Sequence, residues 1–218
     1  IDKPCVKFGL SKEADYYAEN IEITEFGSIF NVVLPSKEKI LIKTKLLGKL
    51  NILNIVGAVA IADKLGLNAE QIKAGTKLIK TVEHRLQLKQ NANGSIIIDD
   101  AYNSNPVGSK MAVEVLGLMP GEKIIVTPGM IELGKEQYNL NYKFGEYISD
   151  VCDYVILIGE KQTKPIHDAL IDKKYNNKKI FILNDVREAF PLMNRISGID
   201  GKETYVLLEN DLPDLFNE

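Results

Sequence analysis

The sequence predicts an α/β protein in which a mostly parallel sheet flanked by helices follows a β-rich and then helical segment. Beyond about residue 81, short apolar runs typical of buried strands alternate with helical patterns. Helices of roughly 10–15 residues between such strands indicate βαβ units. The first 50 residues instead hold short runs broken by glycine and proline, and the period then becomes helical. We therefore place a domain boundary between residues 82 and 83.

The N-terminal segment, residues 1–82, is expected to hold strands and two helices. Three runs have the alternating or apolar pattern of strands: 5–11, 21–35 and 39–48. Apolar and small residues then take helical spacing over 51–66, and Gly66 is a candidate C-terminal cap. A second helix is expected over 68–79, with Asn68 as its N-cap.

The C-terminal segment, residues 83–218, is expected to form the parallel sheet. The predicted strands are 95–99, 123–127, 154–158, 179–183 and 204–208. The predicted helices are 106–118, 136–149, 163–171 and 186–196. Ligands bind at the carboxyl ends of the strands in such sheets, so polar residues directly after a strand are the candidate site.

Composition excludes several classes of protein. A net charge of -3 with scattered lysines and arginines gives no footprint for nucleic acid. No apolar run reaches 18 residues, so we expect no membrane insertion. Cys5 and Cys152 match no metal-ligand spacing, and two histidines exclude a His-rich metal centre. We expect a cytoplasmic protein, and the sequence leaves its oligomeric state open.

The stretch IIIDDAYNSNP holds the main polar cluster. Ile96, Ile97 and Ile98 form a buried strand that runs into Asp99 and Asp100. Asn followed by Pro then favours a helix start at residues 105 and 106, so both acids share a corner with a helix N-terminus. A carboxylate there can accept the hydroxyls of a ribose. Helix capping, turn chemistry and metal binding stay open as alternatives.

Three other segments are candidates, each with a structural alternative. Asn51 and Asn54 share a helix face, although asparagines near a helix start are commonly caps. Arg85 lies at the domain boundary, where it can reach a phosphate or carboxylate or form a surface ion pair. The segment TPGMIELG, residues 127–134, follows the next strand, and its glycines can simply serve a turn.

These segments, in this order, resemble the Mur ligase family, and within it the MurF branch. The quoted segments are GKLNILN, HRL, DDAYNSNPVGS and PGMIELG. The family has G-x-H-N-x-x-N, G-R-L, D-D-x-Y-N-A-N-P-x-S and G-x-M-x-E-L-G. The resemblance covers most of residues 45–170. It implies that 1–82 is the end of a P-loop-type central ATPase domain and that 83–218 is a Rossmann-like C-terminal domain.

The resemblance also implies roles for residues and ligands. Asn51 and Asn54 would lie near the adenine of ATP, Arg85 would contact the nucleotide, and Asp100 would bind its ribose. The implied substrate cleft is lined by Tyr102, Asn103, Asn105 and Ser109. ATP would phosphorylate the carboxylate of a UDP-N-acetylmuramoyl peptide, and the amine of D-alanyl-D-alanine would attack the acyl phosphate. Mg²⁺ would offset the charge of the transferring group.

Several departures from the family pattern limit this reading. Leu50 stands where the family has His, and His84 where it has Gly. The family's late K-G-S-R segment is replaced by LLENDLPDLFNE, in which Glu209 and Asp211 add negative charge where the family often has Lys and Arg.

No G-x-x-x-x-G-K-[ST] phosphate loop occurs in the sequence. We therefore expect Ile1 to lie inside a longer protein, about two-thirds of the way through its central domain, and the isolated chain to be inactive. One alternative is a non-catalytic nucleotide-binding or interaction domain that kept the fold. Another is a folylpolyglutamate-type ligase, against which the YNSNP after Asp100 argues, because that branch tends to have His there.

Overall fold

The computed structural model describes residues 5–91, 94–198 and 201–210. The chain divides into two compact units, Ile1–Thr81 and Val82–Glu218, and we describe each by itself. Asp211 and the rest of the LLENDLPDLFNE segment from residue 211 onward lie outside the described residues.

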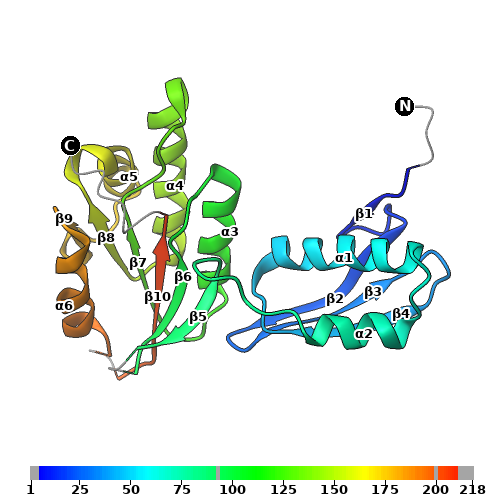
Figure 1. The fold of residues 1–218 in the computed structure, drawn as a ribbon. Helices are drawn as coiled ribbons and strands as arrows, with labels where there is room; N and C mark the ends of the chain where they lie inside the picture. The colour runs from blue at the N-terminus through cyan, green and yellow to red at the C-terminus, as the bar shows by residue number, and fades with distance from the viewer. Residues whose placement is uncertain (1–4, 92–93, 199–200, 211–218) are drawn as a thin grey trace. The chain divides into compact units, whose positions relative to one another are not determined.

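The first unit is a four-stranded sheet with two helices on one face (Figure 1). Its elements are β1 (Phe8–Gly9), β2 (Tyr16–Thr24), β3 (Gly27–Val33), β4 (Lys39–Thr44), α1 (Gly48–Lys64) and α2 (Ala69–Lys77). The strands lie in sequence order, with β2, β3 and β4 antiparallel and β1 parallel to β2. Alternate strand residues such as Phe30 and Ile42 meet Ile52 and Val56 of α1 and Ile72 of α2.

Local signals predicted the helices of this unit well and one strand poorly. Asn68 caps α2 in a reciprocal capping box with Gln71, so that prediction is confirmed. Gly66 has a φ of +89° just after the last turn of α1, as expected for a C-terminal glycine. Strand β2 starts at Tyr16, earlier than the predicted residue 21, and the predicted run 21–35 holds the end of β2, a turn and β3. The polar Glu19 and Asn20 hide its alternation, and a register shift follows Glu19.

The second unit is a six-stranded sheet with helices packed along it, which confirms the predicted fold class. Its strands are β5 (Gln87–Gln90), β6 (Ile96–Asp100), β7 (Glu122–Thr127), β8 (Tyr154–Ile158), β9 (Ile180–Leu183) and β10 (Thr204–Glu209). Its helices are α3 (Pro106–Gly117), α4 (Gln137–Val151), α5 (Glu160–Asp172) and α6 (Val186–Ile196), with 3₁₀ turns η1 (Gly134–Glu136) and η2 (Asn177–Lys179). The strand β5, which was not predicted, is short and polar and pairs antiparallel with β6.

The sheet is buried on both faces, as its continuous apolar runs predict. Leu192 and Met193 of α6 pack on one face against Ile124 and Val206. The neighbouring residue Ile125, whose side chain points to the opposite face, is buried as well. Across the described residues, no helix combines the length and the apolar character needed to cross a membrane.

The strand order places the end of β10 at the centre of the sheet's carboxyl edge. The order is β5-β6-β10-β7-β8-β9, so the last strand in sequence lies between β6 and β7. Glu209 is the register partner of Asp100 on one side, and Leu208 pairs with Val126 on the other. The polar segments that follow β6, β7 and β10 are therefore neighbours.

Candidate functional site

The helix start at the corner after β6 forms as predicted. Asn105 caps α3, and its side-chain oxygen accepts hydrogen bonds from the backbone N–H groups of Val107 at 3.1 Å and Gly108 at 3.0 Å. Pro106 occupies the first helical position, where the missing N–H costs nothing. Because Asn105 Oδ1 already accepts these two hydrogen bonds, it is not free to accept one from a ligand.

Asp99 is held by the protein itself and is buried. It accepts hydrogen bonds from Lys89, from His84 Nδ1 at 3.0 Å and from the backbone N–H of Ala101 at 3.2 Å. Burial alone would raise the pKa of Asp99, but the bonds from Lys89, His84 and Ala101 outweigh it, and the pKa lies below its ordinary value. Asp99 is therefore a structural carboxylate.

His84, which replaces the family's glycine, adopts a left-handed φ of +58°. Glycine takes such a conformation at no steric cost, whereas histidine pays a small penalty. The hydrogen bond between His84 and Asp99 compensates for that penalty. This substitution keeps the turn that presents the next residue, Arg85.

Asp100 points into the corner and is only partly buried. Its Oδ1 accepts a hydrogen bond from the backbone N–H of Leu86 at 3.0 Å. Burial raises the pKa of Asp100, against the opposing effects of the Leu86 N–H group and the Arg85 charge. One carboxylate oxygen is thus oriented by the backbone, which leaves the other for a further partner.

Glu209 is the functional candidate that sequence reasoning missed. It is 1% exposed, it lies within hydrogen-bonding reach of Asp100, and its Oε1 accepts a hydrogen bond from the Ser104 hydroxyl. Burial, followed by the negative charge of Asp100, raises the pKa of Glu209 to about 8. The sequence shows Glu209 only as an acid where the family often has Lys. It does not show that Glu209 lies beside Asp100, because the pairing of β10 with β6 joins residues far apart in the chain.

Ser109 completes this buried cluster. Its side chain is fully buried, and its hydroxyl bonds to Ser104 and donates to the backbone oxygen of Asn105 at 3.0 Å. The predicted contact of Ser109 with substrate stays a prediction, since in this structure the hydroxyl supports the corner from inside.

Arg85 and Tyr102 form the exposed rim of the corner. The guanidinium carbon of Arg85 lies 4.5 Å from the centre of the Tyr102 ring, and Arg85 Nη1 donates to the backbone oxygen of Asn103 at 3.4 Å. More than half of the Tyr102 side chain is exposed. A cation stacked on an aromatic ring beside a partly buried carboxylate suits a ligand that is polar, hydroxylated and negatively charged at one end.

Side chains from α4, from α5 and from the residue after β10 form hydrogen bonds with the backbone of the loop after β7. Asn141 of α4 accepts from the backbone N–H of Met130 at 2.8 Å and donates back to the Met130 oxygen at 2.9 Å. Gln162 of α5 donates to the same oxygen at 2.9 Å, and Asn210 donates to the oxygen of Gly129. Of these residues, only Asn141 could have been noticed from the sequence, as a polar residue on the apolar face of a helix.

Six predicted residues, all of the second unit, are brought to one corner: Arg85, Asp100, Tyr102, Asn103, Asn105 and Ser109. Asn51 and Asn54 belong to α1 of the first unit. Asn51 Nδ2 donates to the backbone oxygen of Leu47 at 2.8 Å, a local bond that fits the capping alternative. Asn54 is exposed and lines a cavity of about 590 Å³ with apolar residues that include Phe8 and Ile61.

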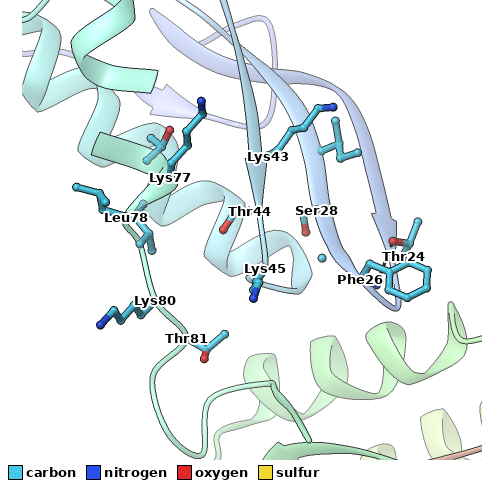
Figure 2. Close-up of a pocket in the computed structure, with 14 residues that line it drawn as sticks. Thr24, Phe26, Ser28, Lys43, Thr44, Lys45, Lys77, Leu78, Lys80 and Thr81 are labelled. Atoms are coloured by element: carbon cyan, nitrogen blue, oxygen red, sulfur yellow. Dashed lines mark hydrogen bonds between the residues drawn. The ribbon is translucent and has the colours of Figure 1, made fainter. Parts of the chain in front are cut away.

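A basic cavity of about 770 Å³ also lies in the first unit (Figure 2). The turn after β2, the end of β4 and the segment after α2 form its walls. Its lysines are Lys43, Lys45, Lys77 and Lys80, with no Asp or Glu among its lining residues. Such a lining attracts anions. This cavity could not be predicted from the sequence because its lysines come from separate segments of the chain.

Comparison with known families matches both units. Residues 84–202 match the Mur ligase, glutamate ligase domain, and residues 2–62 match the Mur ligase middle domain. The UDP-N-acetylmuramoyl-tripeptide–D-alanyl-D-alanine ligase of Escherichia coli K12 is 34% identical over 157 residues. That match covers 72% of this chain and 34% of the relative, so the chain spans about a third of the relative's length.

Solved structures share the fold. MurF from Acinetobacter baumannii superposes with a TM-score of 0.79 at 24% identity, over 94% of this chain and 43% of that protein. MurF from Thermotoga maritima, solved with ADP, gives a TM-score of 0.75 at 23% identity, over 94% of this chain and 44% of that protein.

Proposed function

The chain belongs to the Mur ligase family, and we propose that it serves an ATP-dependent amide ligase as the end of the central ATP-binding domain and the whole C-terminal domain. The proposed domains are residues 1–82 and 83–218. The proposed reaction joins D-alanyl-D-alanine to a UDP-N-acetylmuramoyl tripeptide, which is what the name of the Escherichia coli relative describes. The observation that carries the proposal is the corner formed by Arg85, Asp100 and Tyr102 in a Mur ligase domain.

In this proposal Asp100 accepts the ribose hydroxyls of ATP through the oxygen that the Leu86 N–H leaves free. Arg85 offers its positive charge to the phosphates, and Tyr102 and Asn103 form the exposed wall that the substrates approach. Bound ATP supplies the phosphoryl group that activates the acceptor carboxylate for attack by the amine. The residues of this chain orient the nucleotide for that transfer.

The phosphate and Mg²⁺ end of the nucleotide needs groups from elsewhere in the parent protein. Among the described residues, no three His, Cys, Asp or Glu side chains are grouped closely enough to hold a metal ion. The sequence also contains no Walker-type phosphate loop. We therefore propose that the parent supplies both, that Asn51 and Asn54 approach the adenine, and that the chain alone is inactive.

The test uses the full-length parent with ATP, UDP-N-acetylmuramoyl tripeptide and D-alanyl-D-alanine, and measures phosphate release. Asp100→Ala should raise the KM for ATP by about 10- to 150-fold, the equivalent of about 1.5–3 kcal/mol for a hydrogen bond to a charged group. Asp150→Ala is the matched control, because that side chain is 65% exposed at the end of α4, and its KM should not change. An unchanged KM in Asp100→Ala removes Asp100 from the ribose role.

A non-catalytic nucleotide-binding domain is the second candidate. The replacement of the family's His by Leu50, which is 40% exposed on α1, favours it. This candidate predicts that the parent binds ATP but releases no phosphate with any Mur-type acceptor and amine. Phosphate release that depends on both substrates would exclude it.

A further inference from the structure

The carboxyl groups of Asp100, which is partly buried, and of Glu209, which is fully buried, lie at the ends of two neighbouring parallel strands. They are register partners at the ends of β6 and β10. We propose that Glu209 is a positioning residue that shares a single proton with Asp100, and so sets the orientation and charge of the Asp100 carboxylate. The role of this pair in nucleotide binding depends on the proposed function, whereas the shared proton does not.

Among the described residues, none that hydrogen-bonds Glu209 carries a positive charge to balance its own. Ser104 and Ser109, from the corner and from α3, contribute only hydroxyls. Asn210, the residue directly after β10, donates its side-chain amide to the loop after β7. Glu209 Oε2 is buried and receives no hydrogen bond from a donor among the described residues. Two carboxylates in contact, here one buried and one partly buried, repel each other unless a proton lies between them.

The charged groups nearest to the pair act on Asp100. The positive charge of Arg85 opposes the rise in the pKa of Asp100 that burial causes. The Arg85 guanidinium is also stacked on Tyr102. Asp99 is negative, but Lys89 holds it in an ion pair and His84 in a hydrogen bond. The cations of the corner are thus used by Asp99 and Asp100.

The hydrogen bonds also decide which of the two acids carries the proton. Asp100 accepts from the Leu86 N–H, a bond that favours its anionic form. Glu209 is more deeply buried, and although the hydroxyl bonds from Ser104 and Ser109 favour its anionic form, burial and the charge of Asp100 outweigh them and raise its pKa. The remaining Oε2 then carries the proton and donates it to Asp100. The result is one negative charge, with the Asp100 carboxylate held by Leu86 on one side and Glu209 on the other. Each carboxylate oxygen has two lone pairs, so the oxygen that accepts from Glu209 keeps one for a ribose hydroxyl.

This arrangement makes the corner sensitive to alkali. Here the neutral form of Glu209 persists up to about pH 8. Above that pH the pair holds two negative charges, which repel each other and any phosphate bound beside Arg85.

Carboxyl ¹³C NMR of the chain labelled at Glu and Asp tests the shared proton directly. The Glu209 signal should titrate near pH 8 and be absent in Glu209→Gln, whose amide still donates to Asp100. Glu114→Gln, an exposed control on α3, should leave the Glu209 signal and its titration unchanged. If Glu209→Gln does not fold, Asp100→Asn identifies the same signal by moving it toward the ordinary range. A Glu209 signal that titrates in the acid range overturns the proposal.

Kinetics of the parent give the second readout. The KM for ATP should rise above pH 8 in the wild type and stay flat in Glu209→Gln, while kcat changes equally in both. A KM with the same pH profile in both proteins refutes the positioning role. A Glu209 signal near pH 8 together with an Asp100→Ala variant of normal KM would leave the shared proton standing and refute the ribose assignment of the proposed function.

Discussion

Asn141 is the residue whose replacement most directly tests how the structure holds the loop after β7. Its side chain is fully buried in α4 and forms a two-way pair with the backbone of Met130, which is also buried. In Asn141→Ala the Met130 N–H loses its partner, Asn141 Oδ1, in a place that bulk water does not reach.

The free-energy cost of Asn141→Ala comes from one lost hydrogen bond and a small void. A buried N–H without a partner costs about 1–3 kcal/mol. The Met130 oxygen keeps its bonds from Gln162 and Gln137, so the loss of the amide donor adds little. The missing side-chain atoms leave a small void beside Gly129, for about 1 kcal/mol more. We expect the free energy of unfolding of the second unit to fall by about 2–4 kcal/mol.

Urea unfolding combined with residue-level hydrogen exchange measures this loss. Hydrogen exchange is needed because two units can unfold separately, and a single transition would mix them. The Met130 amide should lose its protection in Asn141→Ala. Asn139→Ala, an exposed change on the same helix, should stay within about 0.5 kcal/mol of wild type. Equal stability of both variants, with Met130 still protected, would mean that Asn141 does not hold the loop after β7.

Three further predictions concern capping, pH and backbone geometry. Asn105→Ala should lower stability by about 1 kcal/mol in thermal unfolding, because the cap accepts from two backbone N–H groups, and Asn105→Asp should restore most of it. Because the pKa of Asp99 is lowered, the folded state binds fewer protons than the unfolded chain near pH 4, so stability should fall as acid protonates Asp99. Lys89→Met should move this loss to higher pH and cost about 1 kcal/mol at pH 7, since the Lys89 side chain is partly exposed; an unchanged acid-unfolding profile would contradict it. Gly27→Ala should destabilise the first unit by about 2 kcal/mol or more in urea, because φ is +132° and a Cβ would lie 2.1 Å from a backbone oxygen of β4, whereas Gly75→Ala, with open space around it, should not.

Local patterns were enough to predict most of the elements. The apolar runs of the second unit predicted five of its strands, because strands buried on both faces need continuous apolar sequence. Capping by Asn68 and by Asn105 with Pro106 was predicted from nearest neighbours, because a cap bonds only two or three residues along the chain. Strand β5 was not predicted because it is short and polar and lies at the edge of the sheet.

The family and the polar corner after β6 could be predicted from the amino-acid sequence, since both depend on residues close together in the chain. The position of β10 between β6 and β7 becomes visible only in the folded chain. That order puts Glu209 against Asp100 and lets Asn210 hold the loop at Gly129, contacts that span about a hundred residues of sequence. Strand order follows from how helices and strands pack together, and no local pattern records it. The paired carboxyls at the centre of the site are therefore a property of the fold.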